Sequence, residues 1–363
     1  MKALILGKGK SGTAAAALLK AQGCEVDFAD GYDCVVISPG LRTKSELQLG
    51  CEELKRRGWK LLAVTGSKGK SSVVKLVADA IGGIPCGNYG RPVTDLIQEK
   101  PGWAVVEVSS FQLETTTLPS DTFEAAAILN LQEDHLDRHG SVEVYHGLKR
   151  KLLTMTRRPI ETGAGVPVLW KGSYFDNEIL SENAAIAVEL MRVAGLDDSK
   201  IAAAFKAFKP LPHRMNLVAE IDGVRYVDDS KATSLAALIA GVKMASARPL
   251  PFSLFPLPFV RLIAGGLPKG DDPKTALSVL TERVRKVYLI GQSAEAFFVA
   301  WNGAVDCEIC GTMDRAVEAA KREAEKDETV LLSPGTASFD QFQSFGERGD
   351  VFARLVKEKG QPK

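Results

Sequence analysis

Cysteine is scarce in this chain, and its few positions form no disulfide framework that could replace a hydrophobic core. Six cysteines are spread over 363 residues, which is typical of buried thiols in a reducing cytoplasm. Cys307 and Cys310 form one C-x-x-C, but a zinc site would need a second such pair. We interpret the two as ordinary strand residues, the alternative being a redox pair at a helix start.

An excess of one charge and long apolar runs are also missing. The formal net charge is +1, so we expect neither nucleic acid nor a membrane surface as a partner. No stretch is long enough to span a bilayer, and the apolar run in residues 1–7 is too short for a signal peptide. We therefore expect a cytoplasmic protein. That it is a monomer acting on small molecules is a separate expectation, which charge and hydropathy do not address.

The composition is otherwise that of an ordinary globular protein. Hydrophobic residues make up 45% of the chain and charged residues 25%, and a chain of this length predicts about two or three domains. Apolar strand-like runs alternate with segments of helical spacing, which indicates an α/β fold. Pro210 and Pro212 mark a boundary between domains.

The most informative stretch is Thr65–Ser72, which reads T-G-S-K-G-K-S-S. An apolar run precedes it and a helical pattern follows, so the context is strand, glycine-rich turn and helix. Gly66 and Gly69 allow the backbone to approach an anion, and the first N–H groups of the helix favour negative charge. Lys70 can reach terminal phosphates, and the Ser71 hydroxyl can bind Mg²⁺. The segment is called the phosphate loop below.

This loop is a tighter form of the general pattern G-x-x-x-x-G-K-[ST], because the first glycine of that pattern falls on Val64. A plain helix start with chance glycines is the alternative. Glu107 stands near the end of the predicted strand 103–108, where a carboxylate beside a phosphate loop commonly binds Mg²⁺.

A second glycine-rich turn, Gly7–Gly12, joins the predicted strand 2–6 to the helix 13–21. With an acidic residue about 20 positions on, it fits the dinucleotide fingerprint. The same geometry serves any diphosphate at a helix N-terminus. Residues 1–60 are too few for a complete dinucleotide domain, which argues against a dehydrogenase.

The remaining elements follow from apolar periodicity and from glycine and proline positions. We expect a loop insertion at Pro249–Pro258 and a final helix from about Phe339. The predicted strands are 25–30, 33–37, 61–64, 125–130, 217–221, 224–227, 260–264, 287–290 and 330–332, and the predicted helices are 45–57, 73–81, 141–153, 181–194, 199–208 and one ending near 244.

These motifs together resemble the Mur ligase and folylpolyglutamate synthetase superfamily, and most of all its D-glutamate-adding branch. The resemblance covers most of residues 61–355, while residues 1–60 match only at Gly7–Gly12 and Ser38–Gly40. The matching segments are 65–72, 87–90, 107–114, 130–140, 145–149, 213–214, 229–233, 265–270 and 333–349.

The resemblance implies three domains and one reaction. A truncated Rossmann-like domain (1–60) would bind the UDP end of UDP-N-acetylmuramoyl-L-alanine. A central P-loop domain (61–210) would bind ATP, and a Rossmann-like domain (211–363) would bind the amino acid. The reaction is ATP-dependent amide formation through an acyl phosphate, in peptidoglycan precursor synthesis.

The resemblance also implies the catalytic and metal-binding residues. Lys70 would neutralise phosphate charge, Ser71 and Glu107 would hold one Mg²⁺, and His135 would help to hold a second. Lys149 would be carbamylated by CO₂, because an ammonium cannot bind a metal. The alternative for Lys149 is a solvated lysine, but the family spacing of tyrosine and lysine places it four residues after Tyr145.

Three further sets of residues are carried over from the family, with interdomain or core packing as the alternative. The set for ATP is Gly66, Ser67, Lys68, Gly69, Lys70, Ser71, Ser72, Asn183, Arg214, Asp229 and Lys231. The set for the UDP substrate is Ser11, Gly12, Ser38, Gly40 and Asn88, and the set for D-glutamate is Thr233, Lys269, Ser338 and Phe345.

The chain departs from the family at Ser234, where an asparagine is usual, and in its short N-terminal part, which lacks a strand and a helix. Two other hypotheses stay open. One is a superfamily relative with another acceptor or amino acid. The other is an ATP-binding partner protein without ligase activity, against which the intact Lys70, Glu107, His135 and Lys149 argue.

Overall fold

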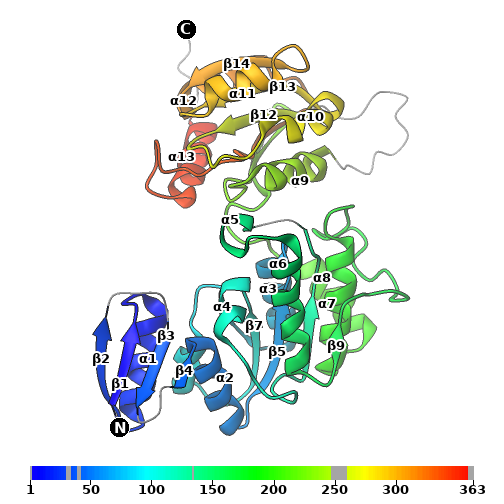
Figure 1. The fold of residues 1–363 in the computed structure, drawn as a ribbon. Coiled ribbons are helices and arrows are strands. Elements are labelled where there is room, and N and C mark those ends of the chain that lie inside the picture. The colour runs from blue at the N-terminus through cyan, green and yellow to red at the C-terminus, as the bar shows by residue number, and fades with distance from the viewer. Residues whose placement is uncertain (1, 30–33, 39–41, 133–134, 247–259, 359–363) are drawn as a thin grey trace. The chain divides into compact units, whose positions relative to one another are not determined.

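The computed structural model describes residues 2–29, 34–38, 42–132, 135–246 and 260–358 (Figure 1). Contacts divide the chain into two compact units. The first unit comprises residues 1–176 and 180–208, and the second comprises 177–179 and 209–363. Each unit is described by itself.

The first unit begins with a small mixed sheet in the order β2-β1-β3-β4. β1 and β2 are parallel, whereas β3 runs antiparallel to both β1 and β4. Helix α1 begins at Lys10, within the Gly7–Gly12 segment and three residues before the predicted start, and alanines and leucines on one side of it are buried. The elements are β1 (Lys2–Leu6), α1 (Lys10–Ala21), β2 (Glu25–Ala29), β3 (Cys34–Ser38), β4 (Arg42–Lys44) and α2 (Glu46–Arg56).

The larger sheet of the first unit has the order β6-β7-β5-β8-β9, and all its strand pairs are parallel. Its strands are almost continuously apolar because helices cover both faces of such a sheet. Its elements are β5 (Lys60–Thr65), α3 (Lys70–Ile81), β6 (Ile84–Gly87), η1 (Val93–Gln98), β7 (Trp103–Glu107), α4 (Ser110–Thr115), β8 (Ala125–Ile128), α5 (Leu136–His139), α6 (Val142–Lys151), η2 (Leu152–Met155), β9 (Pro159–Ile160), α7 (Ser181–Val193) and α8 (Asp198–Ala207).

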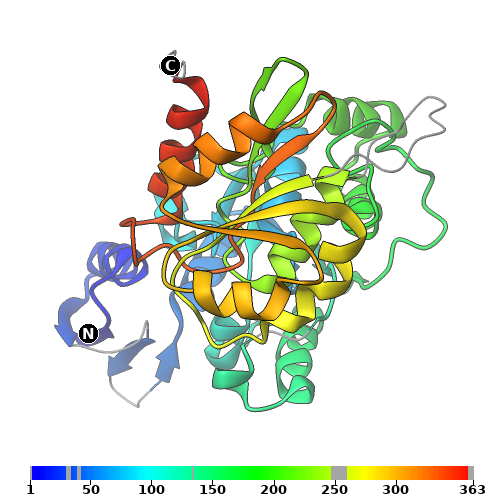
Figure 2. The same cartoon turned by 90° about the horizontal axis from the view of Figure 1, so that it is seen from above.

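The second unit is built on a sheet in the order β10-β11-β15-β12-β13-β14, with only β10 antiparallel to its neighbour among these strands. Its elements are β10 (Asn216–Ile221), β11 (Val224–Asp228), α9 (Leu235–Ser246), β12 (Val260–Gly265), η3 (Pro273–Ala276), α10 (Leu277–Arg283), β13 (Val284–Ile290), α11 (Ala294–Trp301), β14 (Asp306–Gly311), α12 (Met313–Glu323), β15 (Thr329–Leu332) and α13 (Phe345–Lys357). Helices α9 to α11 share one core with the sheet, and α12 and α13 share another on its opposite face (Figure 2).

The expected α/β class is therefore confirmed, while some boundaries differ. The last helix begins at Phe345 and not near Phe339, because the Ser344 side chain caps it by accepting a hydrogen bond from Glu347 N. Strand β4 was not expected. The predicted insertion Pro249–Pro258 lies outside the described residues.

The two cysteines of the C-x-x-C motif lie on β14 but in different cores. Cys307 packs in the cluster with α9 to α11, and Cys310 packs in the cluster with α12 and α13. Their side chains thus point to opposite faces of the sheet, as strand residues and not as a redox pair. Within the described ranges, no helix combines the length and apolarity needed to cross a membrane.

Candidate active site

The phosphate loop connects β5 to α3, and its backbone requires glycine at two positions. Gly66 has φ 148° and Gly69, the N-cap of α3, has φ 82°, a region that other residues rarely occupy. A Cβ on Gly69 would also lie 2.2 Å from Asn183 Nδ2. The loop therefore exposes the backbone N–H groups at the start of α3, which can bind a phosphate.

Two lysines from distant segments meet at this loop. Lys70 Nζ donates hydrogen bonds to the carbonyl oxygens of Gly66 (2.8 Å) and Ser67 (3.1 Å). Lys149, which is 1% exposed on α6, donates to the same Gly66 oxygen at 2.9 Å. The Lys149 ammonium also lies over the Tyr145 ring, 4.6 Å from its centre. Two of the predicted catalytic residues are thus brought together.

Asn183 also lies at the loop, held by a neighbour that the sequence reasoning did not assign. Asn130, just after β8, accepts from Lys68 N at 2.8 Å and donates to Lys68 O at 2.8 Å. The same Asn130 amide donates to Asn183 Oδ1 at 3.0 Å. Asn130 could have been identified from the sequence by its position two residues after a buried strand in the interior of the sheet.

Glu107 ends β7, which pairs with β5 directly before the phosphate loop. The side chain is 2% exposed, and its Oε1 accepts a hydrogen bond from Asn88 Nδ2 at 2.9 Å. In the described part of the chain, its other oxygen, Oε2, is buried with no hydrogen-bond partner. A buried carboxylate oxygen left without a donor is costly unless a cation or another ligand satisfies it.

This arrangement fits Mg²⁺ bound together with ATP. Among the described residues, no group of three or more His, Cys, Asp and Glu is placed to hold a metal by itself. Mg²⁺ in nucleotide sites is commonly held by one or two protein oxygens together with phosphates and water. Glu107 at a strand end and Ser71 in the first turn of α3 are such donors.

His135 belongs to a cluster of aromatic rings beside the loop. It has φ 54°, and its ring centre lies 5.0 Å from Phe111 and 6.3 Å from Tyr145. Tyr145 in turn donates to Ser67 Oγ at 3.2 Å. The predicted metal ligand His135 is thus near Tyr145, the residue that contacts both Ser67 of the loop and the Lys149 ammonium.

His139 is fixed by two polar partners, which the sequence reasoning missed. Its Nε2 lies 3.0 Å from Ser110 Oγ, and its Nδ1 lies 3.3 Å from Glu114 Oε1. Burial lowers the pKa of His139, although Glu114 opposes that shift. The bidentate Arg138–Glu114 pair holds the carboxylate in place. These contacts hold the His139 ring within the aromatic cluster, next to Phe111 and Tyr145.

The described residues of the set predicted for the UDP substrate, Ser11, Gly12 and Asn88, come from separate segments of the first unit. Ser11 and Gly12 lie in the first turn of α1, where a Cβ on Gly12 would lie 2.1 Å from Gly7 O. Asn88 contacts Glu107. Ser38 ends β3, and its side chain and Gly40 lie outside the described part of the structure.

Three residues predicted to bind the nucleotide lie on neighbouring segments of the second unit: Arg214, Asp229 and Lys231. Asp229 is buried and accepts from Ser333 Oγ (3.0 Å) and Met215 N (3.3 Å). Burial raises the pKa of Asp229 to about 7. Lys231 N donates to His213 O at 3.0 Å, so Lys231 is tied to the segment that carries Arg214.

The residues predicted for D-glutamate also come from neighbouring segments of the second unit. The Lys231 ammonium lies 3.9 Å from the centre of the Phe345 ring, and Lys231 is two residues before Thr233. The segments that precede Lys269 and Ser338 pair through Leu267 and Ala337. Sites at loops after parallel strands are usual in this kind of sheet.

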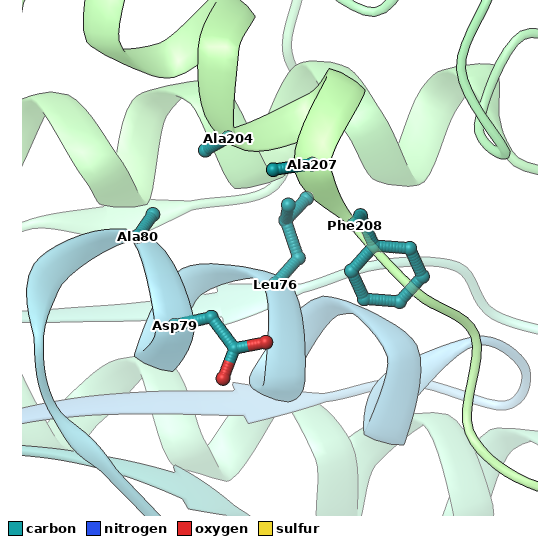
Figure 3. A pocket seen from close by; sticks show the side chains of 6 residues that line it. All are labelled: Leu76, Asp79, Ala80, Ala204, Ala207 and Phe208. Carbon is teal, nitrogen blue, oxygen red and sulfur yellow. The ribbon is translucent and has the colours of Figure 1, made fainter.

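A separate pocket lies between α3 and α8 (Figure 3). Its volume is about 100 Å³, well below the several hundred Å³ of a typical ligand site. None of the predicted site residues lines it, so we assign it to imperfect helix packing. The lining residues are Leu76, Asp79, Ala80, Ala204, Ala207 and Phe208.

Comparison with known families and proteins adds to this geometry. The Mur ligase middle domain matches residues 64–162, and the Mur ligase, glutamate ligase domain matches residues 213–335. A UDP-N-acetylmuramoylalanine--D-glutamate ligase of Francisella philomiragia is 32% identical, over 90% of this chain and 86% of its own. The ligase of the same name from Gloeobacter violaceus is 32% identical, and the match covers 97% of this chain and 98% of the relative.

Solved structures agree at the level of the fold. MurF from Acinetobacter baumannii has a TM-score of 0.63 with 15% identity, covering 98% of this chain and 90% of its own. Escherichia coli FolC in complex with DHPP and ADP has a TM-score of 0.59 with 15% identity, and the match covers 88% of this chain and 94% of the FolC chain.

The alignment with the Gloeobacter protein runs over 447 positions, so that relative contains segments that this chain lacks.

Proposed function

The chain belongs to the Mur ligase family, and we propose that it joins D-glutamate to UDP-N-acetylmuramoyl-L-alanine, coupled to the conversion of ATP into ADP and phosphate. The observation that carries this proposal is the match to ligases of that name over nearly the whole chain. The activity belongs to peptidoglycan precursor synthesis. The convergence of Lys70 and Lys149 at the phosphate loop supports it from the side of the structure.

The proposed reaction has two steps. A carboxylate oxygen of the alanine attacks the γ-phosphorus of ATP, and ADP leaves. The amine of D-glutamate then attacks the acyl carbon, and phosphate leaves while the nitrogen loses a proton. Charge on the phosphoryl group is spread in the transition state, so positioned cations and N–H groups should contribute most of the rate. Lys70 and the N–H groups at the start of α3 are placed for this.

Two Mg²⁺ ions are proposed as cofactors besides ATP, and they would neutralise phosphate charge when bound. Ser71 and Glu107 would hold one, which the unpartnered Glu107 Oε2 favours. His135 and a carbamylated Lys149 would hold the other. Carbamylation would replace a buried ammonium beside Lys70 by an anionic group that can accept a cation.

The other assignments are proposals of the same kind. Gly66, Ser67, Lys68, Gly69 and Ser72 would contact the phosphates of ATP, and the sets predicted above would bind its nucleoside, the UDP substrate and D-glutamate. We propose the domain limits 1–60, 61–210 and 211–363. We further propose that the protein is a monomer and that it acts in the cytoplasm. The five described cysteines, all of them free thiols, favour the cytoplasmic location.

Phosphate release from ATP tests the function directly. We expect release to require UDP-N-acetylmuramoyl-L-alanine and to be stimulated by D-glutamate, but not by L-glutamate or lysine. Stimulation by lysine in place of D-glutamate would identify a relative with another amino acid. No stimulation by any amino acid would instead favour an ATP-binding protein without ligase activity.

A further inference from the structure

Arg348 on α13 is a buried cation without a role in the sequence reasoning. It is 0% exposed, and all three nitrogens of its guanidinium donate hydrogen bonds. Nε donates to Ser230 Oγ (3.0 Å), Nη1 to Ala337 O (3.1 Å), and Nη2 to Ser230 O (3.0 Å) and Thr336 O (3.1 Å). Burial lowers the pKa of Arg348 to about 10, so the group stays charged near neutral pH.

The oxygens that Arg348 contacts belong to the segments carrying the proposed D-glutamate residues. Ser230 begins the segment that leads to Thr233, and Ala337 immediately precedes Ser338. Ser230 Oγ, which accepts from Arg348, donates in turn to Phe345 O at 2.8 Å. One side chain therefore links three of these segments directly or through a single hydroxyl.

The fourth segment is linked through Ala337. Leu267 N donates to Ala337 O at 2.9 Å, and Ala337 N donates to Leu267 O at 3.2 Å. This places Leu267, two residues before Lys269, in register with the loop that Arg348 holds. Gly266 shows how tight the junction is, because a Cβ there would lie 2.4 Å from Ala337 O and 3.0 Å from Arg348 Nη1.

The charge of Arg348 is not cancelled by contact. Within the described part of the chain, its guanidinium forms no ion pair, and its hydrogen bonds go to carbonyl and hydroxyl oxygens. Asp228 and Asp340 act on it only through their longer-range fields. A buried cation in a medium of low polarity acts over longer distances than one in water, so it favours nearby anions.

We propose that Arg348 is a positioning residue for the amino-acid site, holding the four segments in register and favouring a dicarboxylate through its uncancelled charge. This inference deepens the proposed function and rests on it. The planar donor group contacts two of these segments directly and is linked to the other two through Ser230 and Ala337. Small errors in the geometry of such a site reduce binding strongly.

A second buried arginine of the same unit provides a matched control. Arg261 on β12 is 5% exposed, and it donates to Glu328 Oε2 (2.5 Å) and to the Tyr288 hydroxyl (2.9 Å). Its charge is paired, and it lies near the start of β12, whereas the Arg348 junction follows the end of that strand. Loss of Arg261 should therefore weaken the fold without reaching the amino-acid site.

The test measures KM for D-glutamate and for ATP, kcat and urea unfolding of the full chain for Arg348→Lys, Arg348→Gln, Ser230→Ala and Arg261→Lys. We expect Arg348→Lys, which keeps the charge but loses the planar fork, to raise KM for D-glutamate by about tenfold. Arg348→Gln should raise it further. Ser230→Ala, which leaves the Arg348 charge in place and removes one of its acceptors, should raise it by less.

The control separates a positioning role from a structural one. Arg261→Lys should unfold at lower urea yet keep KM for D-glutamate within about twofold of the wild type. Equal effects of Arg261→Lys and Arg348→Lys on that KM, or an unchanged KM in Ser230→Ala and Arg348→Lys, would overturn the inference and leave the function standing. A wild-type protein without D-glutamate-dependent phosphate release would overturn both.

Discussion

Lys70 and Lys149 donate hydrogen bonds to one and the same acceptor, the carbonyl oxygen of Gly66, at 2.8 and 2.9 Å. Their ammonium groups are therefore no more than about 6 Å apart, a distance at which like charges disfavour one another. ATP phosphates would relieve this repulsion. Conversion of one of the two cations into an anion would turn this like-charge contact into an attractive one, so the position of Lys149 is compatible with the carbamylation that the family resemblance implies.

We expect Lys149→Ala to lose at least about 100-fold in kcat, because we propose that this side chain, as a carbamate, holds a metal ion at the transferred phosphate. Added short carboxylates such as acetate or formate should restore part of the rate, since they can occupy the space of the missing carbamate. In the wild type, removal of CO₂ and bicarbonate should lower the rate, and ¹³CO₂ should give a carbamate carbon signal by NMR.

Lys151→Ala is the control for that experiment. Lys151 lies on the same helix but donates to Leu113 O at 2.9 Å and not to the phosphate loop. We expect this variant to stay active and to gain nothing from acetate. Full activity of Lys149→Ala without any added carboxylate would exclude the carbamate, whatever the control does.

Glu107 should determine how much Mg²⁺ the enzyme needs. Glu107→Gln keeps the shape and can still contact Asn88, but it removes the anionic charge from the buried Oε2 position. We expect at least about a tenfold rise in the Mg²⁺ concentration for half-maximal rate, because Mg²⁺ prefers anionic oxygen ligands. The measurement is a Mg²⁺ titration of phosphate release at fixed ATP.

Glu46→Gln tests whether any buried carboxylate would give that result. Glu46 accepts from Thr94 N (2.8 Å) and Thr94 Oγ1 (2.9 Å), and burial raises its pKa. Its removal should change stability but leave the Mg²⁺ requirement as in the wild type. The same shift in both variants would contradict a metal-binding role for Glu107.

Features that depend on residues close together in the chain could be predicted from the sequence. The phosphate loop is local, since glycines, a lysine and a helix pattern within Thr65–Ile81 specify it. Arg348 could not be found in this way, because its partners Ser230 and Thr336 become neighbours only after the strands pair. The start of α13 was misplaced although its cap at Ser344 is local, because the residues between Phe339 and Ser344 are also compatible with a helix.

Cys307 and Cys310 should not form a disulfide in the folded protein, because β14 directs them into different cores. Burial also raises the pKa of these thiols to about 11 and about 12, so little thiolate is present. Treatment with a mild oxidant followed by peptide mass analysis should show both cysteines reduced. The same oxidant applied in urea should link them, and a native Cys307–Cys310 bridge would refute the placement.

Asp229 should make the second unit less stable as the pH rises. Its pKa in the fold is about 7, against an ordinary value of 3.8. Between these two values the unfolded chain releases the proton and the folded chain keeps it, so stability falls by at most about 1.4 kcal/mol per pH unit. Asp229→Asn can still accept from Met215 N and should lose this dependence.

The measurement is urea unfolding of both proteins at about pH 5 and about pH 7, a window that lies within the predicted range. The advantage of Asp229→Asn over the wild type should grow from the lower to the higher pH. Other groups titrate equally in the two proteins and cancel in the comparison. A difference that stays the same at both pH values would show that Asp229 titrates normally.

Gly69 and Gly82, the residues that flank α3 at its two ends, allow backbone strain to be separated from damage to the site. Both have positive φ, 82° and 62°, so alanine at either position should cost about 1 kcal/mol in stability. They differ in surroundings: a Cβ at Gly82 meets nothing within 4 Å, whereas at Gly69 it lies 2.2 Å from Asn183 Nδ2.

Gly69→Ala should therefore displace Asn183 and the loop backbone, and we expect KM for ATP to rise by at least about tenfold. Gly82→Ala should unfold slightly earlier in urea while its KM for ATP stays at the wild-type value. The two variants carry the same strain, so a difference in KM reports the loop alone. Equal KM values would mean that the loop tolerates a side chain at Gly69, and that the close approach of Asn183 is not needed to bind the nucleotide.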